Sequence, residues 1–250
     1  MSLSVIIITK NEAAVIARCL QSVAWADEII LFDTDSSDGT PDLARALGAK
    51  VHSAPDWPGF GPQKNRALAL ATGDYVLSID ADEWVTPELR AEIEQALAAP
   101  DRLPAYRLPR LSSYCGRVMR HSGWWPDHVT RLFQRSAAKF SDDLVHERLI
   151  VDGVTGSLHE PLRHEAIRDL DDALAKMTSY STAGAKMMLA RGKSASLSSA
   201  VFHGLWTFSR TYVLRAGFLD GREGFMLAVS NAEGAYYRYL KLMLLAEKAP

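Results

Sequence analysis

The chain of 250 residues is poor in cysteine, with only Cys19 and Cys115 and no C-x-x-C pair. This composition disfavours a disulfide framework and a cysteine zinc site, and it is typical of a reducing compartment. No stretch reaches the ~18 uncharged apolar residues that a membrane-spanning helix needs. The first apolar run, at 3–8, is too short for a signal peptide and lacks a basic flank. We therefore expect a cytoplasmic protein without a membrane-spanning segment.

Glycine-rich phosphate loops are missing as well. A dinucleotide-binding sheet carries G-x-G-x-x-G after its first strand, whereas this chain has Thr9-Lys10-Asn11-Glu12 at that position. The G-x-x-x-x-G-K-[ST] loop is also absent from the sequence. Phosphates bound by this protein must therefore be held by a metal ion and by side chains.

Neither sign of charge dominates, because the formal net charge is −2 at pH 7. This balance excludes a globally basic nucleic-acid binder, so we expect no nucleic-acid partner. The segment 102–139 is different, with eight Lys or Arg and one acid, Asp127. Such a local positive excess is typical of a surface that meets an anionic partner.

Strand-like and helix-like segments alternate through the first hundred residues. Strands are expected at 4–9, 28–32, 50–53 and 75–79, and helices at 11–23, 41–47, 63–71 and 87–98. This order is typical of an α/β fold with a Rossmann-like, mostly parallel sheet and helices on both faces.

The pattern changes after Pro100. Further strands, at 105–111 and 129–134, flank an aromatic loop, and the chain is helical from about 167 onward. We therefore expect an α/β domain, 1–165, and a C-terminal helical segment, 166–250. The apolar residues of this segment favour packing on the sheet or among the helices, with contact at a membrane surface as the alternative.

Two carboxylates one residue apart, Asp80 and Asp82, follow the apolar strand at 75–79. The carboxyl end of such a strand faces a crevice, and unpaired carboxylates are costly to bury. Mg²⁺ and Mn²⁺ prefer one or two carboxylates together with the phosphates of a substrate. The sequence therefore favours a divalent-cation site, and ordinary strand-end or helix-capping acids are the alternative.

Four motifs share one side of the predicted sheet: 9–12, Asp33, Gln63-Lys64-Asn65 and Asp80-Ala81-Asp82-Glu83. Over nearly the whole chain, this set resembles the family 2 glycosyltransferases of the GT-A fold. A closer resemblance is to the lipopolysaccharide-core glycosyltransferases that add a hexose to inner-core heptose. The segments that carry it are WPGFG at 57–61, HSGWWPD at 121–127, RLF at 131–133, VHE at 145–147 and RAGFLDG at 215–221.

The resemblance implies an inverting, metal-dependent transfer of a hexose, glucose from UDP-glucose, to an anionic lipopolysaccharide inner-core acceptor. It also implies peripheral contact with the cytoplasmic face of the inner membrane. The alternatives are transfer to another glycan or to a protein, and a non-catalytic subunit that binds sugar nucleotides. A D-x-D phosphatase is disfavoured, because its carboxylates follow the first strand and these follow the fourth.

The resemblance also assigns residues to the donor and to a cation, Mg²⁺ or Mn²⁺. Asp82 is implied as the direct metal ligand, and Asp80 as a second ligand or a ribose contact. The other donor-binding residues implied are Thr9, Asn11, Glu12, Asp33, Lys64, Asn65 and Ala81. A solvated helix position remains the alternative for Lys64, and helix capping or loop bonding remains the alternative for Asn65.

An inverting transferase needs a carboxylate base for the acceptor hydroxyl. Glu147 is the first choice by resemblance and Asp127 the second, and surface ion pairing is the alternative for Glu147. The implied acceptor-binding residues are Trp124, Trp125, Arg117, Arg120, Arg131 and His146. The arginines have a competing interpretation, which is pairing with acids elsewhere in the fold.

One position departs from the family pattern. Asp35 stands where relatives carry a glycine, in the segment after Asp33. Aspartate adopts positive φ more readily than most residues, so we expect Asp35 to keep the backbone of that glycine. Its added negative charge near an anionic donor bears on donor affinity and identity.

Overall fold

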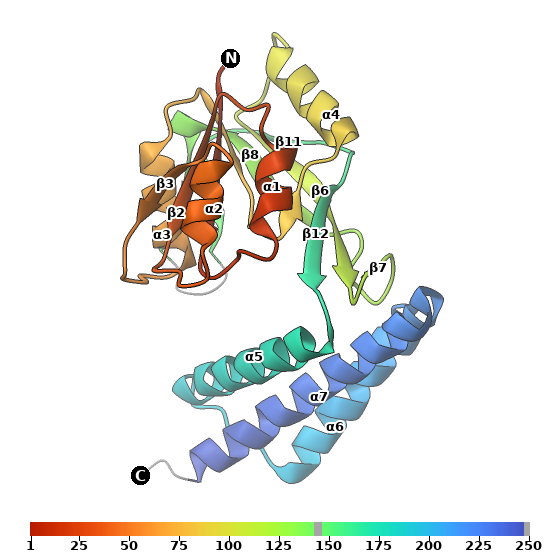
Figure 1. Ribbon diagram of the computed structural model, residues 1–250. Helices are drawn as coiled ribbons and strands as arrows, with labels where there is room; N and C mark the ends of the chain where they lie inside the picture. The colour runs from red at the N-terminus through yellow and green to blue at the C-terminus, as the bar shows by residue number, and fades with distance from the viewer. Residues whose placement is uncertain (143–146, 248–250) are drawn as a thin grey trace. The chain divides into compact units, whose positions relative to one another are not determined.

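The structure is a computed structural model that describes residues 1–142 and 147–247. Figure 1 colours the chain by residue number. The chain divides into two compact units. The first, here called the core unit, comprises Met1–Arg110 and Asp127–His164. The second, the helical unit, comprises Leu111–Pro126 and Glu165–Pro250. The segment 111–126, which the sequence analysis assigned to the α/β domain, thus groups with the helices.

The core unit is built on the predicted sheet. Four parallel strands, in the order β3-β2-β1-β4, form one side of it. Their bounds are β1 (Leu3–Thr9), β2 (Glu28–Asp33), β3 (Lys50–Ser53) and β4 (Tyr75–Ser78). Next to β4 lies β8 (His128–Gln134), which runs antiparallel to both β4 and β6 (Ala105–Tyr114). The mostly parallel α/β sheet expected from the sequence is therefore confirmed.

Shorter strands complete the sheet. β5 (Glu83–Trp84) pairs antiparallel with β12 (Leu162–Ile167), β11 (Thr155–Ser157) pairs parallel with β6, and β7 (Arg117–Val118) pairs antiparallel with β6. A separate hairpin joins β9 (Ala138–Phe140) to β10 (Leu149–Val151), and a 3₁₀ turn at Arg135–Ala137 precedes it.

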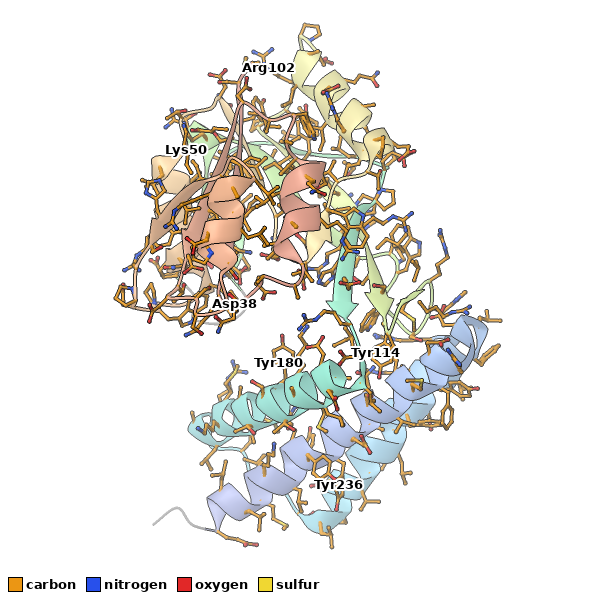
Figure 2. All side chains as sticks on the ribbon, viewed as in Figure 1. Asp38, Lys50, Arg102, Tyr114, Tyr180 and Tyr236 are labelled. Carbon is orange, nitrogen blue, oxygen red and sulfur yellow. The ribbon has the colours of Figure 1, made fainter. Side chains whose placement is uncertain are left out.

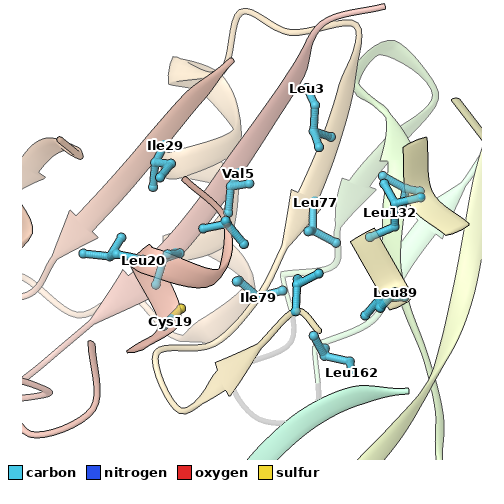
Figure 3. Packing of buried hydrophobic residues seen from close by; sticks show 14 of the residues in the cluster. Leu3, Val5, Cys19, Leu20, Ile29, Leu77, Ile79, Leu89, Leu132 and Leu162 are labelled. Carbon is cyan, nitrogen blue, oxygen red and sulfur yellow. The ribbon is translucent and has the colours of Figure 1, made fainter. Parts of the chain in front are cut away.

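Helices cover both faces of the sheet because its buried strands are apolar on both faces. On one face α1 (Ile16–Ser22), α2 (Thr40–Ala46) and α4 (Pro87–Ala98) pack on alternate residues such as Val5 and Leu77. Figure 3 shows part of this cluster, in which Leu20 lies beside the strands. On the other face α3 (Phe60–Leu70) packs on the intervening residues.

The parallel register brings three polar strand ends to one edge of the sheet. Thr9 of β1 is the register partner of Asp33 of β2, and Asp80 follows β4 two residues after its last strand residue. Because β1, β2 and β4 run in the same direction, their carboxyl ends meet at this edge. We call it the carboxyl edge.

The helical unit contains three long helices, α5 (Leu170–Ala190), α6 (Leu197–Ser209) and α7 (Gly221–Ala246). α7 packs against both α5 and α6 (Figure 1). A π-helical turn η2 (Arg210–Leu214) and a 3₁₀ turn η3 (Gly217–Asp220) connect α6 to α7. Side chains at Asp169 and Ser196 cap α5 and α6. Among the described residues, no helix is long and apolar enough to cross a membrane.

Close helix approach in this unit depends on small residues. A Cβ at Gly204 of α6 would lie 3.4 Å from the carbonyl oxygen of Ala232 and 3.3 Å from Cβ of Tyr236, a residue labelled in Figure 2. Beside it, the ring of His203 stacks on Tyr239 at a centroid distance of 3.8 Å. Small residues on one helix therefore make room for large ones on the next.

Candidate active site

A hydrogen-bonded pair at the carboxyl edge joins the ends of β1 and β2. The hydroxyl of Thr9 donates to Oδ1 of Asp33 at 2.9 Å, and both residues are buried. Ser36 donates its backbone N–H to Oδ2 of Asp33 at 2.8 Å and its hydroxyl to Oδ1 at 2.5 Å. These contacts fix the orientation of the Asp33 carboxylate. The contact with Thr9 follows directly from the register of the two strands.

The loop after Asp33 is held by the loop after β1. Asp35 has φ = 52°, so the expected positive φ is confirmed. Asn11 also has positive φ, 57°, and its side-chain oxygen accepts the Ser37 N–H at 2.9 Å. The backbone N–H of Glu12 donates to the hydroxyl of Thr40 at 2.8 Å. These bonds explain why α1 begins at Ile16, later than the 11–23 expected.

Lys64 joins two carboxylates at the centre of this edge. Its side chain is 4% exposed, and its ammonium Nζ lies 2.8 Å from Oε1 of Glu147 and 3.1 Å from Oδ1 of Asp80. The first turns of α3 place it there. The solvated position considered for Lys64 is therefore wrong, because a buried ammonium is stable only when it is paired.

Arg131 contacts the other oxygen of Asp80. Its Nη2 lies 2.5 Å from Oδ2 of Asp80 and 2.8 Å from Oε1 of Glu83, which is fully buried. Glu83 in turn accepts the Asp80 backbone N–H at 2.9 Å. Arg131 was expected to bind the acceptor; it is 7% exposed, and its acceptor role stays a prediction. The antiparallel pairing of Leu132 with Leu77 directs Arg131 toward the end of β4.

These ion pairs determine the charge of Asp80. Desolvation opposes ionisation, but the charges and hydrogen bonds of Arg131 and Lys64 hold the pKa of the Asp80 carboxyl well below its usual range. For Arg131, desolvation is outweighed by Asp80 and Glu83, which raise the pKa of its guanidinium. Asp80 is therefore a carboxylate at all physiological pH values.

The network continues to the second candidate base. Arg110 lies 3.5 Å from Oε1 of Glu83 through Nη1 and 2.7 Å from Oδ2 of Asp127 through Nη2. Seven charged side chains of alternating sign thus form one continuous chain, in the order Glu147, Lys64, Asp80, Arg131, Glu83, Arg110 and Asp127. The two candidate bases are its ends.

Asp82 lies outside this chain of ion pairs. Its side chain is 28% exposed, and Oδ2 lies 3.4 Å from Nε2 of His164, a residue of β12. Ala81 between the two aspartates is buried, and the Cys19 thiol donates to the Asp80 carbonyl at 3.6 Å. Burial, reinforced by Glu83, Asp82 and Asp80, raises the pKa of this thiol, so Cys19 is an inert core residue.

Asn65 and Gly61 of α3 lie against the backbone of Phe140 and Ser141. The Asn65 amide donates to the Phe140 carbonyl and accepts the Phe140 N–H, both at 2.9 Å. A Cβ at Gly61 would overlap the Ser141 carbonyl oxygen. The local bonding considered for Asn65 is therefore present, and its donor-binding role stays a prediction.

The helical unit contains the tryptophan loop, defined here as residues 120–125. The buried carboxylate of Asp220 accepts the N–H groups of Arg120 and His121 at 3.1 and 3.0 Å. The Ser122 N–H donates to the Arg215 carbonyl at 2.9 Å. The motifs at 121–127 and 215–221, which are far apart in sequence, therefore form one structural unit.

The loop residues expected at the acceptor differ in their surroundings. Trp124 packs edge-on against Tyr114, with ring centroids 6.1 Å apart, and Trp125 is partly exposed before Pro126. The side chains of Arg117 and Arg120 belong to exposed residues. Their acceptor roles stay predictions. His146, also expected at the acceptor, lies outside the described residues.

Sequence reasoning assigned no role to Glu83, Arg110 or Asp220. Glu83 stood inside the quoted D-x-D-E motif and Asp220 inside RAGFLDG, so the signal was present. Only the fold shows that both carboxylates are buried acceptors of backbone N–H groups. Their roles support the neighbouring motif residues.

Comparison with known families identifies the class of this α/β protein as the glycosyltransferases. Residues 4–150 match the model of Glycosyl transferase family 2, so the chain belongs to this family. The expected family and enzyme class are therefore confirmed.

Relatives span nearly the whole chain. An uncharacterized glycosyltransferase of Rickettsia felis is 33% identical over 98% of this chain and 89% of its own length. The lipopolysaccharide core biosynthesis glycosyltransferase LpsC of Rhizobium meliloti is 28% identical over 97% of this chain and 92% of its own. A solved structure of S. aureus TarS 1–349 in complex with UDP-GlcNAc has a TM-score of 0.51 at 13% identity, covering 99% of this chain and 92% of that one. This last likeness concerns the fold.

Proposed function

We propose that this glycosyltransferase is an inverting, metal-dependent enzyme that transfers glucose from UDP-glucose to a lipopolysaccharide inner-core acceptor. The observation that carries the proposal is the contact of Lys64 with both Asp80 and Glu147. It joins the strand-end carboxylate of the donor site to a carboxylate able to serve as base. The similarity to LpsC, whose name denotes lipopolysaccharide core biosynthesis, supports the acceptor class.

The nucleoside of the donor would bind at the Thr9–Asp33 pair. An ionised carboxylate has about four acceptor positions, and Thr9 and Ser36 account for three hydrogen bonds to Asp33. The carboxylate therefore retains capacity for the N–H of a pyrimidine. Asn11 and Glu12 border this position, since both belong to the loop that holds the 33–37 segment.

The residues at the end of β4 fit a divalent cation. Asp82 and His164 offer an oxygen and a nitrogen 3.4 Å apart, and the seven-residue network next to them has four acids and three bases. The described residues contain no cluster of three or more His, Cys, Asp or Glu placed to hold a metal. A cation completed by donor phosphates requires only one or two protein ligands. Asp82, with Asp80 or His164, would hold Mg²⁺ or Mn²⁺, which supplies positive charge for the leaving diphosphate.

Glu147 would act as the general base. The acceptor hydroxyl oxygen attacks the anomeric carbon as its proton passes to the Glu147 carboxylate. The bond from that carbon to the diphosphate oxygen breaks, and the nucleoside diphosphate leaves with the electron pair. Lys64, buried between Asp80 and Glu147, would hold both carboxylates in position and present its positive charge to the diphosphate.

The exposed arginines of the helical unit would bind the anionic acceptor. Arg117 and Arg120 suit phosphate or acidic sugar groups, which guanidinium binds through paired hydrogen bonds. Trp125 would supply ring contact to a sugar. Asp220 supports this assignment indirectly, because it fixes the backbone that carries Arg120.

Donor hydrolysis and transfer with a panel of UDP-sugars, with and without EDTA, test the proposal. We expect hydrolysis of UDP-glucose above other donors, loss in EDTA and recovery with Mn²⁺ or Mg²⁺. Transfer should require a heptose-containing inner-core acceptor. Transfer to another glycan or to a protein would replace the acceptor assignment, and donor binding without any turnover would indicate a non-catalytic subunit.

A further inference from the structure

Helix α6 has its large apolar side chains on the outside. Its buried residues are small, Ala200 and Gly204, and Thr211 of the following turn η2 is also buried. The exposed side of α6 carries five large apolar side chains, whose exposure runs from 45% at Val201 to 67% at Leu205. These residues are Leu197, Val201, Phe202, Leu205 and Trp206. The pattern is the reverse of that of a helix packed on a water-soluble core.

The apolar surface continues beyond the end of α6. Phe208 and Tyr212 contact Phe225 with ring centroids 5.7 and 5.5 Å apart, and Tyr212 contacts Phe218 at 6.2 Å. Phe218 and Phe225 are 51% and 47% exposed. An aromatic cluster thus connects the outer side of α6 with η3. An exposed apolar surface that carries this many large side chains marks an interaction site.

The segment that carries α6 and η2 has charges of one sign. The segment 191–219 contains Arg191, Lys193, Arg210 and Arg215 and has no aspartate or glutamate. All four basic residues are exposed. A second copy of the chain on the same surface would bring like charges together, whereas an anionic surface complements them. The charge pattern therefore favours an anionic partner over a second copy of the chain.

We propose that the outer side of α6, extended by η3, lies in the interface of an anionic lipid bilayer. Such a helix buries its apolar side at the boundary of headgroups and acyl chains, while its basic residues meet anionic headgroups. Trp206 suits this depth, since tryptophan is enriched at membrane–water interfaces. Small residues on the inner side allow α6 to pack closely on α7, so the large ones remain outside. The inference does not depend on the identity of donor or acceptor.

Vesicle flotation of the full chain tests this surface. The protein should float with phosphatidylcholine vesicles that contain phosphatidylglycerol and float weakly with phosphatidylcholine alone. The double variant Phe202→Glu, Leu205→Glu should reduce the bound fraction at least about tenfold, because two charges would enter the apolar boundary. Tyr180→Glu is the matched control, because Tyr180 on α5 is 66% exposed and lies on a different helix (Figure 2). It should bind as the wild type does.

Two further measurements complete the test. Brominated acyl chains should quench part of the tryptophan fluorescence of the wild type. This quenched part should be missing in Trp206→Phe. Circular dichroism verifies that the double variant is folded. If it is not folded, the milder double variant Phe202→Ser, Leu205→Ser is used in its place. Equal flotation of wild type and double variant would overturn the proposal, as would no flotation of the wild type. A dimer that forms without vesicles and is lost in the double variant, with no flotation, would identify a second copy as the partner instead.

Discussion

The ammonium of Lys64 lies 2.8 Å from the Glu147 carboxylate oxygen Oε1, in a site where Lys64 is almost fully buried. The two residues are 83 positions apart in sequence. The same ammonium lies 3.1 Å from Oδ1 of Asp80, so the strand-end carboxylate and the candidate base pair with the same lysine. Removing Lys64 would take this ammonium from Glu147 and leave Asp80 with Arg131 alone, and breaking buried ion pairs is destabilising. Substitutions here must therefore be compared by both folding and turnover.

Substitution of Asp82 best separates an effect on metal binding from an effect on folding. Its side chain is partly exposed and lies outside the ion-pair chain. We expect Asp82→Asn to abolish transfer while its urea unfolding matches the wild type, because the metal ligand is lost and packing is kept. EDTA should have the same effect reversibly. Asp101→Asn, an exposed acid of the same unit, is the control. Full activity in EDTA would contradict the metal assignment.

Glu147 and Asp127 are distinguished by amide substitutions. We expect Glu147→Gln to lower kcat by roughly 10²-fold or more with little change in donor affinity, since a general base acts in the transition state. Asp127→Asn should have a smaller effect, because Glu147 shares Lys64 with the strand-end carboxylate of Asp80, whereas Asp127 pairs with Arg110. Steady-state kinetics with saturating acceptor measures both. If Asp127→Asn is inactive and Glu147→Gln is near normal, the roles are exchanged.

Gly61 should be intolerant of a methyl group. A Cβ there would overlap the Ser141 carbonyl oxygen and lie 3.4 Å from Cβ of Glu147. We expect Gly61→Ala to cost about 1–3 kcal/mol in the free energy of unfolding and to lower kcat, because the added methyl group would displace Ser141 and contact the candidate base Glu147. Gly234→Ala is the control, since its Cβ would meet only Met177 at an ordinary 3.4 Å. A Gly61→Ala enzyme with normal stability and kcat would show that this contact has no role.

The sheet and its active edge could be predicted because their signals are local. Alternating strands and helices give a parallel sheet, and parallel strands place Asp33 and Asp80 at one edge. The position of Arg131 could not be predicted in this way. It depends on β8 pairing antiparallel beside β4, a contact between segments about 55 residues apart along the chain. Periodicity reveals which residues are apolar but not which strand becomes a neighbour.

The same limit explains Asn65 and Glu83. Asn65 stands in a motif that resembles donor-binding residues, yet its amide pairs with the backbone of Phe140 on β9. Glu83 reads as one more acid of an acidic turn, yet it is fully buried between two arginines. Both roles arise from distant strands that the local sequence does not specify.

Glu28 should make stability depend on pH at the other end of β2. Burial by itself raises the pKa of its carboxyl, but hydrogen bonds from Lys50, Ser4 and Thr72 lower it to about 2. The folded state thus binds this proton less tightly than the unfolded chain, whose glutamate pKa is about 4.3. The resulting stability, about 3 kcal/mol, is present above pH ~5 and lost as the pH falls toward 2.

Urea unfolding between pH 7 and pH 3 checks this expectation. Glu28→Gln should be less stable than the wild type at pH 7, and its stability should fall less as the pH decreases. Asp42→Asn is the control, because Asp42 is an exposed acid paired with Arg45 on the surface. Parallel pH profiles for Glu28→Gln and the wild type would contradict the role given to these hydrogen bonds.

The arginines of the helical unit should determine acceptor affinity. Arg117 and Arg120 are exposed, and the Arg117 guanidinium lies beside Gly221 at the start of α7. We expect Arg117→Glu, Arg120→Glu to raise the acceptor KM roughly tenfold or more, because anionic groups lose charge-assisted hydrogen bonds. Donor hydrolysis should be unchanged. Added salt should raise the wild-type KM in the same direction, since exposed charges are screened beyond about 8–10 Å at physiological ionic strength.

The competing interpretation is that these arginines serve the helical unit itself. The hydrogen bond from Arg222 is the main cause that lowers the pKa of Glu223, and the charge of Arg117 adds a smaller effect in the same direction, so Arg117 already acts on α7. On this interpretation, charge reversal would reduce the free energy of unfolding and leave the acceptor KM and its salt dependence unchanged. Arg90→Glu, an exposed arginine of α4, controls for the general effect of added negative charge. An acceptor KM that rises in the double variant, with Arg90→Glu and thermal stability unaffected, would establish direct acceptor binding by these two residues.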